Sequence, residues 1–155
     1  DRHGSEVAGL NAVRAKIDRG DVDVVAVHDG ARPFPSQKLI GDVIAAARDV
    51  GGAVPGLPVS EPLFELGSGA APRLMQEELV RMQTPQAFRA APLLEAYDAS
   101  GPAGFSAVDT AQTVERFGSL NIVVVPGESS NIKVTYPADV AVADTLARTS
   151  RWALG

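Results

Sequence analysis

The sequence predicts an α/β domain with a mostly parallel sheet. Short apolar, β-branched runs at residues 22–27 and 121–125 are typical of strands covered on both faces. Segments with apolar residues at helical spacing lie between such runs, and clusters of Gly, Pro and Ser mark the boundaries. This strand–helix–strand order favours parallel strands joined by helical crossovers.

The first part of the chain predicts alternating helices and strands. Apolar residues recur at helical spacing over residues 5–17, and the first strand follows at residues 22–27. Ser36 can cap the next helix, and the glycine pair at residues 51–52 can end it. Residues 53–59 then form the second strand.

The middle of the chain predicts a hairpin. Residues 59–66 and 73–80 can pair as its two arms, although the LMQEELV stretch in the second arm is equally compatible with a helix. A connector at residues 84–88 then leads to a short helix over residues 90–99.

The last third predicts two helices separated by a strand. We expect helices over residues 107–116 and 137–148, the latter with a proline at its first turn. The strand at residues 121–125 and a short extended piece at residues 132–135 lie between them.

Composition excludes several classes of protein. The 155 residues suffice for one compact domain, and the net charge of -5 argues against a general nucleic-acid binder. The sequence has no cysteine for a disulfide, thiolate site or nucleophile, and 2 histidines are too few for a histidine-rich metal site. No apolar stretch reaches membrane-spanning length, so we expect a cytoplasmic protein without a membrane partner.

The stretch VHDGARPF carries an acid and an arginine directly after the first strand. In open α/β sheets, ligands bind beyond the carboxyl ends of the strands. There, Asp29 is a natural ligand for Mg²⁺, and Arg32 can pair with phosphate oxygens. The alternative is that Asp29 caps a turn and Arg32 neutralises it.

Four further residues are candidates for the same site. Lys133, in SSNIKVT, suits a phosphate, unless it is a solvent-facing residue of an alternating strand. The Thr84 hydroxyl and the Gln86 amide, in QTPQAF, can bind a polar substrate, unless this segment only connects two elements. Asp109 is either a second acid of the site or an early-helix residue that complements the helix dipole.

The missing motifs also narrow the chemistry. The sequence contains no GxSxG elbow, no Walker A loop and no GxGxxG motif. Covalent acyl transfer is therefore disfavoured. A metal, one or two carboxylates, an arginine and a lysine indicate transfer of a phosphoryl or nucleotidyl group, in which the protein positions anions and neutralises developing charge.

Four stretches, in this order and spacing, resemble a single family. RHGSEVAGL, VHDGARPF, QTPQAF and NIKVTYPADVAVAD are similar to the 2-C-methyl-D-erythritol 4-phosphate cytidylyltransferases of non-mevalonate isoprenoid biosynthesis. The resemblance implies a Rossmann-like, GT-A-like nucleotidyltransferase fold. It also implies that residues 58–83 form a protruding β-arm of a homodimer, and that residues 1–155 are the carboxyl-terminal two-thirds of the domain.

The resemblance further implies a reaction and roles for the candidate residues. CMP would pass from CTP to methylerythritol phosphate with release of pyrophosphate, assisted by Mg²⁺ or another divalent cation. Asp29 would hold the metal, Arg32 would support the phosphate-rich site, and Lys133 would bind phosphate or substrate. Thr84 would contact the substrate.

The resemblance places the nucleotide near the start of the sequence. Arg2 and Ser5 correspond to a family stretch whose serine lies near the cytosine. The family's Gly-rich loop, which carries an Arg and a Lys for the CTP phosphates, has no counterpart in these residues. Some bacteria fuse this enzyme to the cyclodiphosphate synthase of the same pathway, so a fusion partner is a further expectation.

Several positions depart from the family pattern. They are Glu61, Pro62, Phe64, Gln76 and Ser130. These departures leave two alternatives open. One is a diverged, catalytically impaired nucleotide-binding module, and the other is a cytidylyltransferase for another polyol phosphate such as ribitol 5-phosphate.

Overall fold

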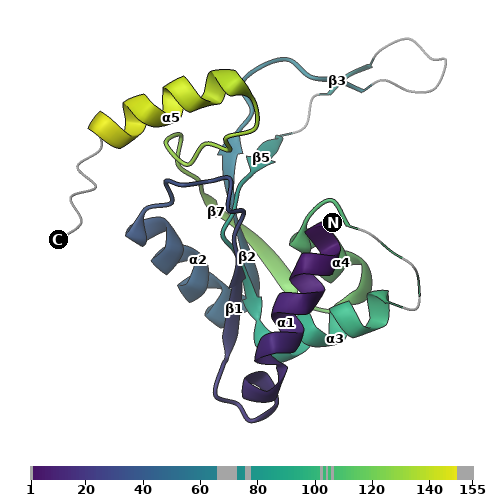
Figure 1. Cartoon of the computed structure of the whole chain (residues 1–155). Helices are drawn as coiled ribbons and strands as arrows, with labels where there is room; N and C mark the ends of the chain where they lie inside the picture. Colours follow the sequence, from purple (N-terminus) through teal and green to yellow (C-terminus); the bar gives the residue numbers. More distant parts are fainter. Residues whose placement is uncertain are drawn as a thin grey trace.

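The computed structural model describes residues 2–65, 73–75, 78–101, 103, 105 and 107–149. The helices are α1 (Arg2–Asp18), α2 (Gln37–Val50), α3 (Ala90–Ser100), α4 (Thr110–Phe117) and α5 (Pro137–Thr149). The central sheet consists of β1 (Val24–Val27), β2 (Gly51–Pro58), β5 (Val80–Met82), β6 (Gln86–Arg89) and β7 (Asn121–Pro126). Helix α2 covers one face of this sheet, and α1, α3 and α4 lie on the other (Figure 1).

The sheet combines a parallel core with an antiparallel insertion. β1, β2 and β7 run in the same direction, which confirms the predicted α/β class. β6 lies between β1 and β2 and is antiparallel to both. The connection from β1 through α2 to β2 therefore crosses over β6. The sequence predicts only a connector at residues 84–88, whereas β6 begins inside that segment.

β1 is shorter and more exposed than the sequence predicts. It covers Val24–Val27 instead of residues 22–27, and in the described part of the chain it pairs only with β6. Ala26 is exposed and the other three residues are half-buried. Both faces of β1 nevertheless pack against a core, Val25 toward α1, α3 and α4 and Val24 toward α2. The prediction of a strand covered on both faces is therefore confirmed in part, with Ala26 exposed.

Strand alternation gives the sheet two hydrophobic cores. Val54 and Phe88 pack toward α1, α3 and α4, whereas their chain neighbours Ala53 and Ala87 pack toward α2. Phe88 is fully buried. Full burial of such a side chain contributes about 1.5–3 kcal/mol, so the two cores fix the register of β2 against β6.

Helix α2 has the ends that the sequence predicts. Ser36 is its N-cap, and the Ser36 hydroxyl accepts a hydrogen bond from the backbone N–H of Leu39 at 3.0 Å. Gly51 ends the helix at φ 123°, a conformation that favours glycine, and its N–H donates to the Ala47 carbonyl. β2 follows at once, so α2 orients this strand directly.

The predicted hairpin is present. β3 (Phe64–Glu65) and β4 (Arg73–Leu74) are antiparallel, and they extend the pairing of β2 with β5 away from the sheet (Figure 1). This pairing favours the hairpin over the helical alternative for the second arm. The other predicted elements are found with small changes at their ends, except that residues 132–135 are irregular. None of the described helices is long and apolar enough to cross a membrane.

Candidate active site

A tight turn after β1 carries two of the predicted site residues. The backbone N–H of Arg32 donates to the carbonyl of Asp29 at 2.9 Å, and Nε2 of His28 lies 2.8 Å from the Arg32 carbonyl oxygen. The side chain of Asp29 is 17% exposed and that of Arg32 is 11% exposed. The turn therefore holds an acid and a cation in surroundings with little water.

Thr84 fixes this turn from the neighbouring segment. Its hydroxyl oxygen accepts a hydrogen bond from the backbone N–H of Asp29 at 3.0 Å and lies 3.1 Å from Nδ1 of His28. A carbonyl can only accept, so Nε2 of His28 carries the proton that the Arg32 carbonyl receives. In the neutral ring Nδ1 is then an acceptor, and the hydroxyl of Thr84 donates to it. The buried Thr84 is thus a direct support of Asp29.

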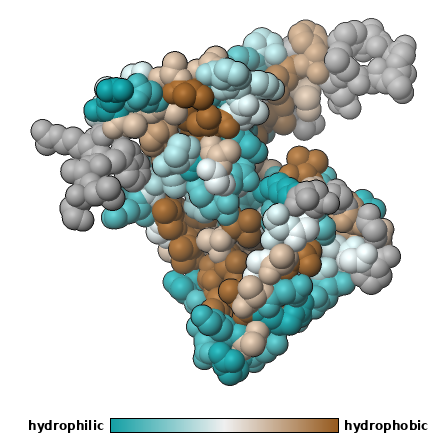
Figure 2. Space-filling view, in the orientation of Figure 1, coloured by the Kyte–Doolittle hydropathy of each residue, from teal (hydrophilic) through white to brown (hydrophobic). Residues whose placement is uncertain are grey.

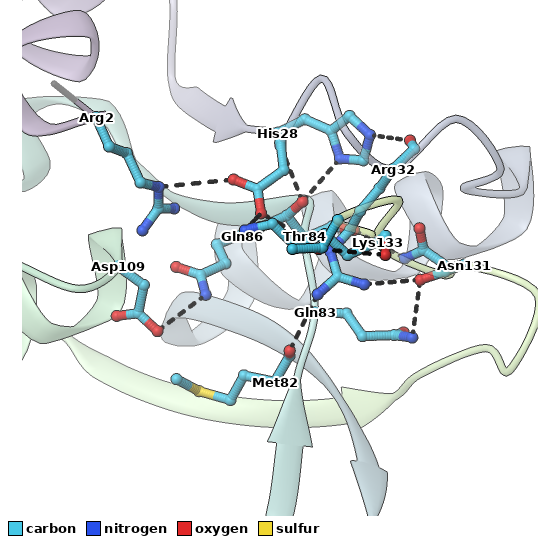
Figure 3. A network of polar contacts seen from close by, with 12 residues as sticks. Arg2, His28, Arg32, Met82, Gln83, Thr84, Gln86, Asp109, Asn131 and Lys133 are labelled. Atoms are coloured by element: carbon cyan, nitrogen blue, oxygen red, sulfur yellow. Dashed lines mark hydrogen bonds and ion pairs between the residues drawn. The ribbon is translucent and has the colours of Figure 1, made fainter. Parts of the chain in front are cut away.

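Three cations surround the Asp29 carboxylate, and Figure 3 labels all three, Arg2, Arg32 and Lys133. Nζ of Lys133 lies 3.0 Å from Oδ2, Nε of Arg2 lies 3.6 Å from Oδ1, and Nε of Arg32 lies 3.9 Å from Oδ2. The sequence predicted these four residues as site members, and the fold brings them together from α1, the turn after β1 and the segment before α5. Such a cluster of cations is suited to phosphate oxygens.

Lys133 is held in place by its own backbone segment. The N–H of Val134 donates to the carbonyl of Ala31 at 2.8 Å, and Nη1 of Arg32 donates to the Asn131 carbonyl at 2.8 Å. The buried side chain of Asn131 also donates to the Thr84 carbonyl at 2.8 Å. These contacts explain why Lys133 lies at Asp29 without a strand to place it.

A buried glutamine clamps the loop before Lys133. Nε2 of Gln83 donates to the carbonyls of Glu128 and Asn131 at 2.8 and 3.2 Å, and its Oε1 accepts from the Glu128 N–H at 3.0 Å. Sequence reasoning missed His28, Gln83, Glu128 and Asn131. The available signal was the position of His28, Gln83 and Asn131 inside the motif stretches VHDGARPF, QTPQAF and NIKVTYPADVAVAD.

A buried acid, Glu6, positions Arg2 beside Asp29. Nη2 of Arg2 lies 3.2 Å from Oε1 of Glu6, and Glu6 accepts hydrogen bonds from the Tyr97 hydroxyl at 2.5 Å and the Thr110 hydroxyl at 3.1 Å. Burial and the hydrogen bond to Glu6 raise the pKa of Tyr97 above its ordinary range. Arg2 also donates to the Val108 carbonyl. The arginine is therefore anchored from α3 and α4.

Two cavities lie on the two sides of the turn. The first, of about 540 Å³, runs between α1 and the free edge of β1. Its polar end is lined by Arg2, Ser5 and Asp29, and its apolar end by Leu10 and Val25. Figure 2 shows the apolar surface along the middle of this face, over β1. A flat, partly apolar group with a polar edge matches this lining.

The second cavity, of about 470 Å³, lies on the Arg32 side of the turn. Arg32 and Lys133 line it together with the polar side chains of Gln83, Asn131 and Thr135. Nε of Arg32 is buried and has no hydrogen-bond partner among the described residues. This cavity is therefore suited to an anion that accepts hydrogen bonds from Arg32 and Lys133.

Gln86 and Asp109 lie apart from the cation cluster. The buried amide of Gln86 accepts from the Ala111 N–H at 3.1 Å and donates to Asp109 at 3.5 Å. Asp109 is the N-cap of α4, where its carboxylate accepts from the Gln112 N–H at 2.9 Å. It lines a third cavity, of about 730 Å³, rather than the cavity of Asp29. The fold thus places Asp109 at the start of α4 and Gln86, on β6, against it.

The departures from the family pattern fall mainly on the hairpin. Glu61, Pro62 and Phe64 are exposed there, and Phe64 is 57% exposed. Ser130 lies in the loop that Gln83 clamps. Gln76 lies outside the described residues. The three hairpin positions do not line either cavity beside the Asp29 turn.

Comparison with known families gives one consistent match. A family model described as 2-C-methyl-D-erythritol 4-phosphate cytidylyltransferase matches residues 1–149. The enzyme of this name from Bacillus pumilus is 37% identical over 147 residues, which cover 94% of this chain and 62% of the relative. The "Bifunctional enzyme IspD/IspF" of Anaeromyxobacter dehalogenans is 40% identical over 144 residues, covering 90% of this chain and 37% of that protein.

Solved structures agree with the sequence match. The 2-C-methyl-D-erythritol 4-phosphate cytidylyltransferase of Thermus thermophilus is similar with a TM-score of 0.74 and 37% identity, over 90% of this chain and 69% of that chain. The 4-diphosphocytidyl-2C-methyl-D-erythritol synthase of Anaerococcus prevotii has a TM-score of 0.84 and 26% identity, over 96% of this chain and 64% of that chain. The chain spans less than two thirds of the length of the curated relatives that it matches. For the Bacillus pumilus enzyme the share is 62%.

Proposed function

This chain belongs to the 2-C-methyl-D-erythritol 4-phosphate cytidylyltransferase family, and we propose that the full-length protein is a cytidylyltransferase. It would transfer CMP from CTP to 2-C-methyl-D-erythritol 4-phosphate and release pyrophosphate. The chain would then be the carboxyl-terminal two-thirds of that enzyme's domain. The product would serve non-mevalonate isoprenoid biosynthesis.

One observation carries this proposal. Asp29 and Arg32 stand on a single turn between two cavities, and Lys133 reaches the same turn from the other end of the chain. A reaction between two phosphorylated substrates requires two adjacent sites with cations at their junction. We assign the cytidine of CTP to the cavity of Arg2 and Ser5, and the acceptor phosphate to the cavity of Arg32 and Lys133.

The proposed mechanism is a direct displacement. An oxygen of the acceptor phosphate attacks the α-phosphorus of CTP, the bond from that phosphorus to the bridging oxygen breaks, and pyrophosphate leaves. Arg32 and Lys133 would orient the phosphates and stabilise the charge that develops on the transferring group. The hydrogen bond from the Asp29 N–H to Thr84 would keep the acid in place during this step. No covalent intermediate with the enzyme is required.

Asp29 is also the proposed ligand of Mg²⁺ or another divalent cation. Within the described part of the chain, no three acidic or histidine side chains gather to hold a metal alone. This donor set fits Mg²⁺, which is commonly held by one or two carboxylates together with substrate phosphates. When bound, the ion would neutralise negative charge on the triphosphate. Asp29 would contribute the protein oxygen, and Lys133 would turn toward the phosphates.

The remaining assignments concern Thr84, Gln86, Asp109 and the assembly. We propose that Thr84 contributes to substrate binding, as do Gln86 and the neighbouring Asp109. We propose that the hairpin of residues 58–83 joins two copies in a homodimer, because it exposes Leu63 and Phe64. We place the protein in the cytoplasm, where CTP is available.

We further propose that the chain is fused to a second enzyme of the pathway, and the bifunctional relative supports this proposal.

A pyrophosphate-release assay tests the function. The full-length protein is incubated with CTP, Mg²⁺ and methylerythritol phosphate, and in parallel with ribitol 5-phosphate or with no acceptor. We expect release only with methylerythritol phosphate. Release with ribitol 5-phosphate alone would select the alternative substrate, and calorimetric CTP binding without any release would select the impaired nucleotide-binding module.

A further inference from the structure

The second cavity contains a cation that the sequence analysis did not consider. Arg81 lies on β5, where it pairs with Leu57 of β2, and its side chain lines the cavity of Arg32 and Lys133. Among the described residues, no carboxylate or carbonyl is within hydrogen-bond or ion-pair distance of its guanidinium. An arginine that lines a cavity and pairs with none of the described residues is suited to bind a ligand there.

Strand geometry explains why Arg81 faces this cavity. Residues two apart on a strand share a face, and Gln83, two residues later, lines the same cavity. Met82, between them, points the other way and lines the cavity of Asp109. Because Gln83 is fixed by three hydrogen bonds to the loop before Lys133, the face of the strand that carries Arg81 is fixed with it.

The charges in this cavity are unbalanced. Arg32, Arg81 and Lys133 line it together with one acid, Asp139. Asp29 is a second acid beside these cations, because it pairs with Lys133 at 3.0 Å and with Arg32 at 3.9 Å. The Asp139 carboxylate already accepts hydrogen bonds from the backbone N–H groups of Thr135 and Tyr136, both at 2.8 Å. Burial lowers the pKa of Arg32; Asp29 opposes this shift, and the positive charge of Arg81 adds to it. Like charges held this closely favour a bound anion.

We propose that Arg81 binds the phosphate of the acceptor substrate, together with Arg32 and Lys133. This inference rests on the proposed function and extends it by one residue, because Gln76, one of the departures from the family pattern, carries no charge. Arg81 supplies a guanidinium five residues further along the same arm. The ligand class is a phosphate monoester, whose oxygens match a planar guanidinium in two parallel hydrogen bonds.

The kinetic test compares Arg81→Gln with wild type in the full-length protein. A contact made equally to bound substrate and transition state changes KM and leaves kcat almost unchanged. We expect KM for methylerythritol phosphate to rise about tenfold or more, the size expected for a lost charge-assisted contact, with KM for CTP unchanged. Arg81→Lys keeps the charge but not the paired geometry and should recover part of the loss.

Arg19→Gln is the matched control, because it removes the same charge from an exposed pair with Asp21 after α1. It should leave both KM values unchanged. An unchanged acceptor KM in Arg81→Gln, or a rise confined to KM for CTP, would overturn the assignment of Arg81.

A second measurement separates this inference from the proposed function. Inorganic phosphate should raise the melting temperature of the wild-type protein by binding the folded state, and the rise should be smaller in Arg81→Gln than in Arg19→Gln. If the wild type releases no pyrophosphate but keeps this Arg81-dependent stabilisation, the function fails and the phosphate site stands. If pyrophosphate is released but phosphate stabilises both variants equally, the phosphate site fails and the function stands.

Discussion

The ammonium group of Lys133 lies 3.0 Å from Oδ2 of Asp29, although the two residues come from opposite ends of the chain. Arg2 and Arg32 approach the same carboxylate from other directions. Asp29 is therefore the shared counter-ion of three cations in the protein without substrates. On the proposed function, phosphate groups that enter the site would compete with this carboxylate for the three cations, and substrate binding would be coupled to the release of Asp29.

Removing either member of this pair should impair catalysis. In the full-length protein, Asp29→Asn and Lys133→Gln should each lower kcat/KM for pyrophosphate release by about a hundredfold or more, the range for groups that stabilise transition-state charge. The double variant should lose less than the product of the two effects, because residues in contact are not additive. Lys38→Gln, in an exposed pair with Asp42 on α2, is the control and should keep wild-type rates. Independent, additive losses would argue against a shared role.

Mg²⁺ should bind only together with the nucleotide. Three cations beside one carboxylate oppose a free divalent ion, whereas the phosphates of CTP supply further oxygen ligands. Isothermal titration calorimetry should detect no Mg²⁺ binding to the protein alone and clear binding of Mg²⁺ with CTP. Tight Mg²⁺ binding without nucleotide would contradict the single-carboxylate site.

The Thr84 hydroxyl should be needed for stability as well as activity. Thr84→Val keeps the shape but leaves the backbone N–H of Asp29 and Nδ1 of His28 without their partner. Unfolding by urea should show a loss of about 1–3 kcal/mol, the cost of unsatisfied buried polar groups. Thr84→Ser retains the hydroxyl and should lose less. Equal stability of the two variants would show that these hydrogen bonds are not formed as described.

The loop before Lys133 should be sensitive to one methyl group. A Cβ at Gly127 would lie 2.6 Å from Oε1 of Gln83 and 3.0 Å from the Gly56 backbone. Gly127→Ala should therefore destabilise the protein by about 1–3 kcal/mol. Gly41→Ala makes the same change inside α2, where a Cβ meets nothing within 4 Å, and should stabilise by roughly 0.5–1 kcal/mol. Urea unfolding of both variants measures the difference, and effects of the same sign would contradict the tight contact.

The Tyr97–Glu6 hydrogen bond should appear in the alkaline stability profile. Burial and Glu6 raise the pKa of Tyr97 in the folded state above the ordinary 10.0. The stabilisation is complete below the unfolded pKa and is lost as the pH rises above it, because the unfolded chain then releases the proton first. Above that pH, wild-type stability should fall by about 1.4 kcal/mol per pH unit more steeply than that of Tyr97→Phe. Parallel urea-unfolding profiles of the two proteins would disprove this linkage.

The sequence singled out residues that the fold brings together, but it did not predict their surroundings. Asp29 and Arg32 follow from a strand end and its turn, Lys133 follows from a lone lysine after a Ser/Asn turn, and the fold brings the three together. Their supports are buried amide and hydroxyl groups whose partners lie far along the chain, as with Gln83 and Glu128. Local patterns carry no signal for such contacts, because each of these residues is ordinary in a loop.

The order of the strands in the sheet was also harder to predict than the strands themselves. An apolar run identifies a strand but not its neighbours in the sheet, so the run of β1 gives no sign that β1 lies at an edge of the described sheet. The sequence did not predict β6, because only four residues, Gln86–Arg89, form this strand. Its burial comes from its position between β1 and β2. The caps of α2 were predicted correctly, since Ser36 and Gly51 act through contacts within one helical turn.

Pyrophosphate release by wild type and Asp29→Asn is the most direct test of the central claim that the Asp29 turn joins a nucleotide site to an acceptor-phosphate site. Asp42→Asn, on the exposed face of α2, is the matched control for the lost carboxylate. With CTP, Mg²⁺ and methylerythritol phosphate, wild type and Asp42→Asn should release pyrophosphate at equal rates, and Asp29→Asn at about a hundredth of that rate or less. Equal rates in all three proteins, or no release by the wild type, would contradict the account.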